Sequence, residues 1–302
     1  MQSVSRTYLA RIKNTSRTTL WRRFASLLAH CPTPLAASRQ SKPRVVIVDG
    51  FYLAYPSLKR NRHKAGFHRD KRILLWAIDS TTRRPIYWQF YDAIEDTGIW
   101  KKFIQEMKEY SFYPDYLVHD GHPGITRACD RYWPKAKQQR CLAHFMGNMN
   151  KDLGVSPKTE LAKSLKQLVA ALFTIKTNAD KQVWQKRWQD YLADNQQTIE
   201  QLRKGAAVYQ HGVRIPGLYM SALSVVNNAY KRDEVFTYLD KSEVPKTSNA
   251  IESLNGTLRE LTRRHRGLAL EHRKRLVAWA LAYRQGQTRT QLMSHVSSKR
   301  KP

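Results

Sequence analysis

Three acidic residues far apart in the chain have neighbours that suit metal-dependent phosphate chemistry. Two of them, Asp49 and Asp120, each follow a short apolar run and directly precede a glycine. Ligands gather where strands of a mixed sheet end, so the two carboxylates can meet if their strands are neighbours. Close carboxylates repel unless a cation lies between them, and hard oxygen ligands select Mg²⁺ or Mn²⁺. The alternative is that each Asp-Gly pair is a turn or a helix cap.

The third acidic residue, Glu252, lies in a segment that predicts the start of a helix. Thr247 or Ser248 can cap this helix, which places Glu252 in its first turns. Asn249, Glu252 and Asn255 recur every three residues, so polar side chains follow one helix face. A buried polar face needs hydrogen-bonding partners, and an active site supplies them. The alternative is an exposed helix face.

A basic run follows this predicted helix start. Its members are Arg259, Arg263, Arg264, His265 and Arg266. Beside a metal-binding carboxylate, such residues would bind the phosphates of a nucleic acid. The alternative is an ordinary solvated basic face, which is the usual meaning of such a run.

The net charge of the 302-residue chain indicates a polyanionic partner. There are 53 Lys and Arg residues against 24 Asp and Glu residues, which gives +29. Because phosphate neutralisation releases counterions, nucleic acid is the first candidate. An anionic membrane surface is the second, but no apolar run of about 20 residues could span a bilayer. Cys31, Cys129 and Cys141 are too scattered for a disulfide framework, which indicates a reducing cytosol.

An α/β domain is predicted to position the carboxylates. Apolar and β-branched runs predict strands, and residues with helical periodicity lie between the later ones. The order is three strands, helix, strand, helix, strand, helix, which is the order of a ribonuclease-H-like fold with helices on both faces of a mixed sheet. The predicted strands are 45–48, 73–78, 85–91, 116–118 and 137–141, and the helices are 98–110, 124–132 and one starting near 144.

The remaining segments predict additions to this core. Residues 1–30 predict two short helices, either a DNA-binding helix-turn-helix that presents Arg22 and Arg23 or an ordinary basic hairpin. Proline-rich residues 31–43 predict a linker, and 286–302 predict a basic, frayed tail. The catalytic core is assigned to 44–150 and 245–285, and a large all-helical insertion to 151–244.

The acidic segments resemble the three catalytic blocks of DDE transposases, most closely the Mutator-type transposases of bacterial insertion sequences. The matching segments are Val48-Asp49-Gly50, His119-Asp120-Gly121 and Ser248-Asn249-Ala250-Ile251-Glu252 followed by Arg263-Arg264-His265-Arg266-Gly267. Cys141-Leu142-Ala143-His144 resembles the Cys-x-x-His signature of that family. The long gap between Asp120 and Glu252 is similar to the helical insertion that such transposases carry. Each motif alone is weak, but the four in this order are specific.

The resemblance implies two-metal phosphoryl transfer on double-stranded DNA. Asp49 would bridge two Mg²⁺ or Mn²⁺ ions, and Asp120 and Glu252 would each bind one. Water would first free a 3′-OH at a transposon end, and that hydroxyl would then attack target DNA. The expected DNA contacts are Arg22, Arg23, Arg259, Arg263, Arg264, His265 and Arg266, with a basic cluster at 59–72 further out. The expected active-site supports are Cys141, His144, Asn249 and Asn255.

The same resemblance implies a homo-oligomer on DNA in a bacterial cytoplasm, associated with the nucleoid. Three alternatives remain: a ribonuclease-H-like nuclease that releases cut DNA, a non-catalytic DNA-binding protein derived from a transposase, and a basic membrane-surface protein. Cys141 and His144 could form half of a zinc site, but no second pair stands at finger spacing. Their plain alternative is a buried cysteine and a capping histidine.

Overall fold

The computed structural model describes residues 16–35, 43–53 and 72–297. The first of the two predicted N-terminal helices and the basic cluster up to residue 71 lie outside these ranges. Most of the predicted linker, 36–42, lies outside them too.

The centre of the molecule is a five-stranded mixed sheet in the order β3-β2-β1-β4-β5. Strand β1 pairs antiparallel with β2, and β2 pairs antiparallel with β3. On its other side β1 pairs parallel with β4, which pairs parallel with β5. The predicted element order is therefore confirmed. The strands are β1 (Val45–Tyr52), β2 (Ile73–Asp79), β3 (Pro85–Tyr91), β4 (Tyr116–His119) and β5 (Lys137–Arg140).

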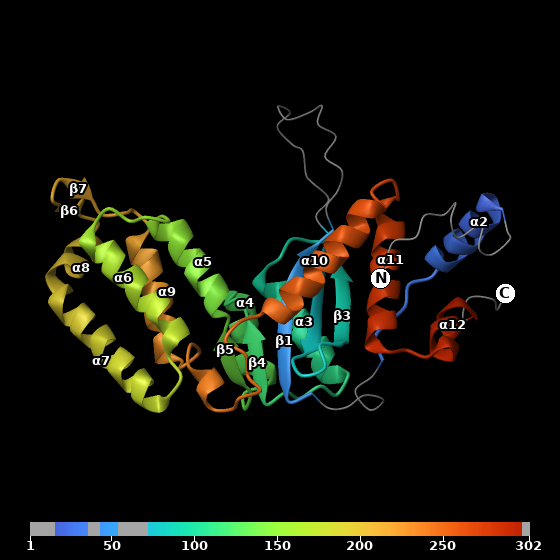
Figure 1. Ribbon diagram of the computed structural model, residues 1–302, viewed down its shortest axis with the longest axis horizontal. Helices are drawn as coiled ribbons and strands as arrows, with labels where there is room; N and C mark the ends of the chain where they lie inside the picture. Colours follow the sequence, from blue (N-terminus) through green and yellow to red (C-terminus); the bar gives the residue numbers. More distant parts are fainter. Residues whose placement is uncertain (1–15, 36–42, 54–71, 298–302) are drawn as a thin grey trace.

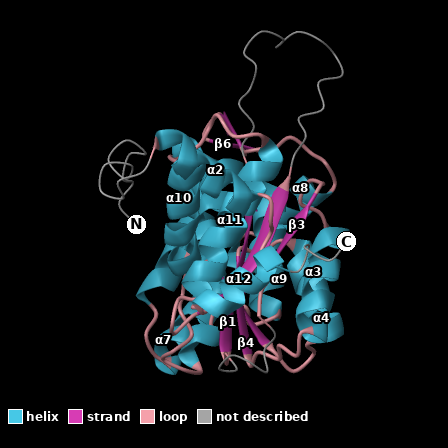
Figure 2. Cartoon of the chain, turned by 90° about the vertical axis from the view of Figure 1, so that its right-hand side faces the viewer, coloured by secondary structure: helices cyan, strands magenta, loops and turns pink. Residues whose placement is uncertain are grey.

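Helices cover both faces of this sheet, which confirms the α/β class. Because side chains alternate along a strand, Val46 and Val48 face one layer while Val45 and Ile47 face the other. The first layer holds α3 (Thr97–Glu109) and α4 (Pro123–Tyr132), and the second holds α5 (Leu142–Leu153), α10 (Asn249–Arg264) and α11 (Leu270–Gln285). Figure 2 shows the sheet between α10 on one side and α3 and α4 on the other.

The first strand is longer than its sequence predicts. Strand β1 continues through Asp49 and Gly50 to Tyr52, because these residues still pair with β2. Asp49 therefore lies inside a strand and not at its end. The alternation of side chains places it on the same face as Val45 and Ile47, toward α10.

A block of helices follows α5 and lies beside the sheet (Figure 1). It consists of α6 (Glu160–Ala171), η3 (Leu172–Thr174), α7 (Asn178–Asp194), α8 (Gln196–Arg203), α9 (Tyr219–Lys231) and η4 (Thr237–Leu239). Trp184 and Trp188 stack in its core with ring centroids 6.0 Å apart, and the Trp184 indole N–H donates to the carbonyl of Leu168 over 2.7 Å.

The predicted all-helical insertion needs one correction. A small hairpin, β6 (Tyr209–Gln210) and β7 (Val213–Arg214), interrupts the helices. His211 and Gly212 join the two strands with φ values of 50° and 76°, the positive φ pair of a tight hairpin turn. Strands of two residues carry no alternation, so the sequence showed only a break in the helical pattern.

The N-terminal helix of the described chain packs against α11. Helix α2 (Arg17–Leu28) has Ser16 as its N-cap, whose hydroxyl accepts the Thr19 N–H. Arg275 and Trp279 of α11 donate to the last carbonyls of α2, those of Leu28 and Leu27. The prediction of a frayed tail is wrong for α12 (Arg289–Ser297), which is helical. None of the described helices is long and apolar enough to cross a lipid bilayer.

Candidate active site

The strand register brings Asp49 and Asp120 to the same level of the sheet. The last paired residues of β1 and β4 are Ile47 and Val118, and the two aspartates each lie two residues further along. Both residues are half-buried. The parallel pairing of β1 and β4 thus accounts for the approach of two residues that are distant in the sequence.

Asn255 of α10 holds the Asp49 carboxylate from above the sheet. Its side-chain N–H donates to Asp49 Oδ2 over 2.6 Å, and its carbonyl accepts the Trp76 indole N–H over 3.1 Å. Trp76 is the residue of β2 that pairs with Asp49. The second carboxylate oxygen of Asp49 accepts the Gly50 N–H over 2.8 Å. Asn255 therefore links α10 to the strand that carries Asp49.

The Asp49 carboxyl group resists ionisation. Burial is the main cause, and the negative charges of Asp120 and Glu252 add to it. The Gly50 N–H and His144 act in the opposite direction, and the balance raises the pKa of Asp49 to about 7. The charges of Asp120 and Glu252 thus both reach the Asp49 carboxyl group, and a cation between the three would relieve this repulsion.

Asp120 lies in a tight turn next to a buried arginine. Its Oδ1 accepts the His122 N–H over 2.8 Å. Gly121 has φ of +93°, and a Cβ there would lie 2.2 Å from Nε of Arg140, so glycine is required for both reasons. Arg140 lies within electrostatic reach of Asp120, with its guanidinium 4.8 Å from the ring of Phe145. Burial lowers the pKa of Arg140. Sequence reasoning missed this residue because it ends an unremarkable polar strand.

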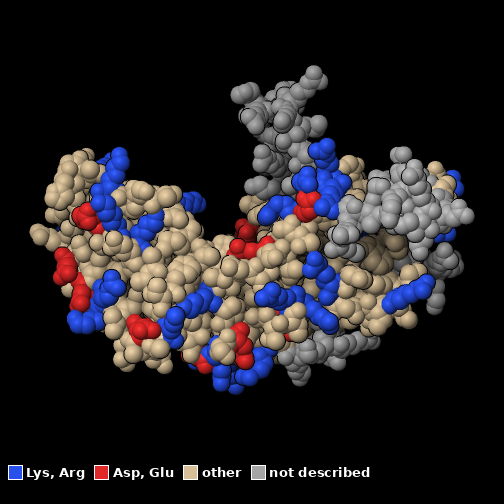
Figure 3. Space-filling view, in the orientation of Figure 1, with Lys and Arg blue, Asp and Glu red and all other residues tan. Residues whose placement is uncertain are grey.

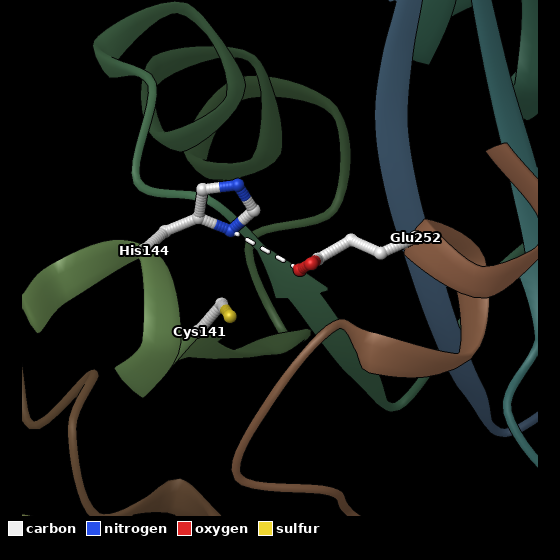
Figure 4. A group of neighbouring side chains, drawn as sticks. All are labelled: Cys141, His144 and Glu252. Carbon is white, nitrogen blue, oxygen red and sulfur yellow. Dashed lines mark ion pairs between the residues drawn. The ribbon is translucent and has the colours of Figure 1, made fainter. Parts of the chain in front are cut away.

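Ser248 joins Glu252 to the Cys-x-x-His pair. Figure 4 shows Cys141, His144 and Glu252, with the contact between His144 and Glu252 as a dashed line. Ser248 is the N-cap residue of α10, but its hydroxyl donates to Glu252 Oε1 over 2.7 Å and does not cap the helix. Its backbone N–H donates to Sγ of Cys141 over 3.2 Å. His144 Nδ1 lies 3.4 Å from Ser248 Oγ and 3.5 Å from Glu252 Oε1. The structure therefore brings together Cys141, His144 and Glu252.

These contacts shift the pKa values of both members of the pair. Burial opposes ionisation of the Cys141 thiol, but hydrogen bonds with His144 and Ser248 outweigh it and lower the pKa. The hydrogen bond with Cys141 is the main cause that raises the pKa of His144 to about 9, with Glu252 and Asp120 adding to it and burial opposing it.

A fourth carboxyl group, which the sequence analysis did not single out, lies beside this group. Glu95 precedes α3, and its Oε2 would lie 3.5 Å from a Cβ at Gly50. The Trp100 indole N–H donates to its Oε1 over 2.8 Å. Burial raises the pKa of Glu95, the charge of Asp120 adds to the rise, and the Trp100 hydrogen bond opposes it. Its sequence context, a loop before a helix, carried no signal for chemistry.

The other predicted residues are placed around this centre and not in it. Asn249 is exposed at the start of α10, unlike Asn255. Arg259, Arg263 and Arg266 are exposed further along α10 and just beyond it, with Arg263 and Arg264 both paired to Glu260. His265 is half-buried, and its ring lies 5.8 Å from that of Phe24 in α2. Arg22 and Arg23 are exposed on α2.

One face of the molecule is hollowed between the helical block and α10. Figure 3 shows acidic side chains at the bottom of a depression between the helical block and α10, with lysines and arginines on both sides. An acidic floor between basic rims suits a bound cation in contact with a polyanion.

A protein-family model matches the middle of the chain. The model described as "Transposase, Mutator family" matches residues 62–211, which include Asp120, Cys141 and His144. No curated protein sequence matches the chain.

Proposed function

Because this chain belongs to the Mutator family of transposases, we propose that it cuts DNA at the ends of an insertion sequence and joins the freed 3′ ends to target DNA. The observation that carries the proposal is the arrangement around Asp49 of β1: the charges of Asp120, just beyond β4, and of Glu252, in α10, both act on its carboxyl group. Three acidic groups from distant segments on one hollowed surface are what metal-dependent phosphoryl transfer requires.

The sheet supports a ribonuclease-H-like core for this chemistry. Three antiparallel strands precede two parallel ones in the order β3-β2-β1-β4-β5, with Asp49 in β1 and Asp120 just beyond the end of the neighbouring β4. The helical block would be the insertion between the last core strand and the helix that carries Glu252. Helix α2, with Arg22 and Arg23 exposed, would be the second helix of a DNA-binding helix-turn-helix.

The site residues fit divalent metal ions. Asp49 has a raised pKa because its own burial and the charges of Asp120 and Glu252 oppose its ionisation. Bound Mg²⁺ or Mn²⁺ would balance the negative charges of the three carboxylates and would polarise the scissile phosphate. Asp49, Asp120 and Glu252 would be the ligands of two ions, with Glu95 beside them.

The chain's own residues would do the remaining work by orientation and charge. Asn255 fixes the Asp49 carboxylate by one hydrogen bond, and the Trp76 indole N–H, which donates to the Asn255 carbonyl, fixes Asn255 in turn. Ser248 fixes Glu252 in the same manner. Arg259 and Arg266 would bind the DNA backbone beside the depression, because phosphate contacts position a duplex without reading its sequence. Since two DNA ends must be held together, the active form would be a homo-oligomer on DNA.

The test is an assay with a DNA duplex that carries the ends of the chain's own element, in Mg²⁺ or Mn²⁺. We expect metal-dependent nicking and, with a pre-cut 3′-OH end, joining to target DNA. Asp49→Asn, Asp120→Asn and Glu252→Gln should each lower both reactions by at least about 100-fold. Asp190→Asn, on the exposed surface of α7, is the matched control and should leave both unchanged.

The outcomes separate the alternatives. Nicking without joining would indicate a nuclease with the same carboxylates. Tight DNA binding that is insensitive to Asp120→Asn, with no cleavage in either metal, would indicate a DNA-binding protein without catalysis, and the proposal would then be rejected.

A further inference from the structure

A second cluster of metal-ligating atoms lies at the edge of the carboxylate site. The Sγ of Cys141, a ring nitrogen of His144 and a carboxylate oxygen of Glu252 all lie within 4.8 Å of one another. Figure 4 shows the three side chains directed toward a common volume from two separate segments. Their chemistry differs from that of the carboxylate group, because a thiol and an imidazole are poor ligands for Mg²⁺ and good ones for zinc.

The backbone brings the first two ligands to one face. Cys141 is the N-cap residue of α5, and His144 lies three residues later in its first turn. Residues three apart on a helix lie on the same side, so the thiol and the imidazole are neighbours without any special loop. The Cys141 sulfur lies against the start of α10, where it accepts the backbone N–H of Ser248 over 3.2 Å.

The third ligand arrives with α10. The loop before this helix is fastened to α5, since the Leu142 N–H donates to the carbonyl of Lys246 over 2.9 Å. This contact places Ser248 against Cys141 and Glu252 against His144. The spacing of Cys141 and His144 alone indicates only half of a metal site. Glu252 is distant in the sequence, so its contribution depends on the tertiary structure.

The distances suit a zinc ion after a small contraction. Ligand atoms around a tetrahedral zinc lie about 3.3–3.8 Å apart, as follows from bond lengths of about 2.0–2.3 Å. The His144 Nδ1 to Glu252 Oε1 distance is already 3.5 Å. His144 and Glu252 are 40% and 41% exposed while Cys141 is buried, so an ion could enter from solvent and keep one water ligand.

Hydrogen bonds from neighbouring groups also hold the three side chains in positions that suit a bound metal ion. The Ser248 N–H already donates to Sγ, a contact that stabilises a thiolate, and the Ser248 hydroxyl orients Glu252. Such hydrogen bonds from outside the ligand set fix metal ligands in place. A thiolate and a carboxylate with a neutral imidazole carry two negative charges, which one Zn²⁺ would neutralise, and the one proton that Cys141 and His144 hold between them would pass to solvent.

We propose that Cys141, His144 and Glu252 form a site for one Zn²⁺ ion, and that zinc there withdraws Glu252 from the catalytic metal site and inhibits DNA cleavage. The inhibition rests on the proposed function, but the binding site does not. Glu252 would thus belong to both the zinc site and the magnesium site. Because it can bind only one of the two ions at a time, zinc binding and magnesium binding would exclude each other.

Binding is tested with Co²⁺, whose thiolate charge-transfer and tetrahedral visible bands report ligation without any activity. The full chain should bind one equivalent of Co²⁺ through a thiolate, and Zn²⁺ should displace it. Cys141→Ser should abolish the charge-transfer band. His144→Ala and Glu252→Gln should keep it with an affinity at least about tenfold lower.

Cys31→Ser and Cys129→Ser are the matched controls, because each removes one of the other free thiols. Both variants should bind Co²⁺ as the wild type does. A charge-transfer band that persists in Cys141→Ser, or its absence from the wild type at a tenfold excess of Co²⁺, would overturn the site. Unchanged affinity in Glu252→Gln would remove Glu252 from it.

Inhibition is tested in the Mg²⁺-dependent cleavage assay, each variant being compared with itself with and without one equivalent of Zn²⁺. Zinc should lower the cleavage rate of the wild type at least about tenfold, and that of Cys141→Ser less than twofold. Full wild-type cleavage with zinc bound would overturn the withdrawal of Glu252. If no metal supports cleavage by any variant, the proposed function fails, while the cobalt titration still decides the site.

Discussion

At the scale of single residues, Asp49 makes the metal-free protein sensitive to pH. Its pKa is about 7 in the folded chain and 3.8 as the ordinary value. Because the folded-state pKa is the higher one, folding favours the protonated form. The metal-free protein should therefore lose stability as pH rises from about 4 to about 7, by an upper limit of about 4 kcal/mol.

Asp49→Asn removes this titration, so the variant should be more stable than the metal-free wild type at pH 7.5. The net gain should be about 1–3 kcal/mol, because asparagine has one acceptor oxygen where Asp49 accepts hydrogen bonds from both Gly50 and Asn255. Urea unfolding in EDTA at pH 4.5 and pH 7.5 measures it. A difference between variant and wild type that does not grow with pH would contradict the assignment.

Added Mg²⁺ should stabilise the folded protein through the same residue. A cation held by Asp49, Asp120 and Glu252 would bind the folded chain alone and raise its Tm. We expect this rise for the wild type at pH 7.5 and a much smaller one for Asp120→Asn. Equal shifts in the two proteins would show that Mg²⁺ binds elsewhere.

Glu95 should matter for catalysis although no motif marks it. Glu95→Gln keeps an oxygen for the Trp100 indole N–H but removes the charge next to Asp120. We expect cleavage to fall about tenfold, which corresponds to about 1.4 kcal/mol of transition-state stabilisation. Glu109→Gln, an exposed change on α3, is the control. Cleavage by Glu95→Gln within twofold of the wild type would place Glu95 outside the reaction.

At the scale of elements, the sequence predicts what depends on local pattern. The β-branched run 45–48, the apolar strands that follow it and the helical periodicity of α3 are local signals, and each element forms where it is predicted. Contacts made over long distances carry no such signal. The pairing of Asp49 with Trp76, which extends β1, and the approach of Glu95 to Asp120 depend on tertiary packing.

Lys246 shows how one element holds another in place. Its ammonium group donates to the carbonyls of Phe173 and Ile175 over 3.0 and 2.7 Å, and it lies 4.6 Å from the ring centre of Tyr238. Its own carbonyl accepts from α5, as described above. Lys246 thus ties the loop before α10 to the helical block around η3.

Lys246→Met should lower the free energy of unfolding by about 1–3 kcal/mol, since two carbonyls lose a charged donor while the stem still packs. Because the change loosens the loop before Glu252, cleavage should fall as well. Lys241→Met, at an exposed position of the preceding turn, is the control. Circular dichroism melting and the cleavage assay measure the two effects. Unchanged stability would show that this contact does not hold the block.

At the scale of the whole molecule, the chain combines a charge of +29 with an acidic site. Bulk charge predicted a polyanionic partner, and the family match agrees with a DNA substrate. Sequence alone could not show which basic residues are exposed. Of the predicted arginines near α10, Arg263 and Arg264 are paired with Glu260, whereas Arg259 and Arg266 are exposed and take part in none of the ion pairs recorded for the described residues.

This difference predicts how DNA binding responds to salt. Each phosphate that a basic residue neutralises should contribute about −0.9 to the slope of log K against log salt concentration. Arg259→Ala combined with Arg266→Ala should therefore reduce the slope by about 2. Arg263→Ala should have a smaller effect, because Arg263 must first leave Glu260 to bind phosphate.

Fluorescence anisotropy with duplex DNA at several salt concentrations measures these slopes. Arg187→Ala, on exposed α7, is the control. If Arg187→Ala changes the slope as much as Arg259→Ala does, the positive charge acts as a diffuse field, and α10 does not form a defined DNA contact beside the carboxylates.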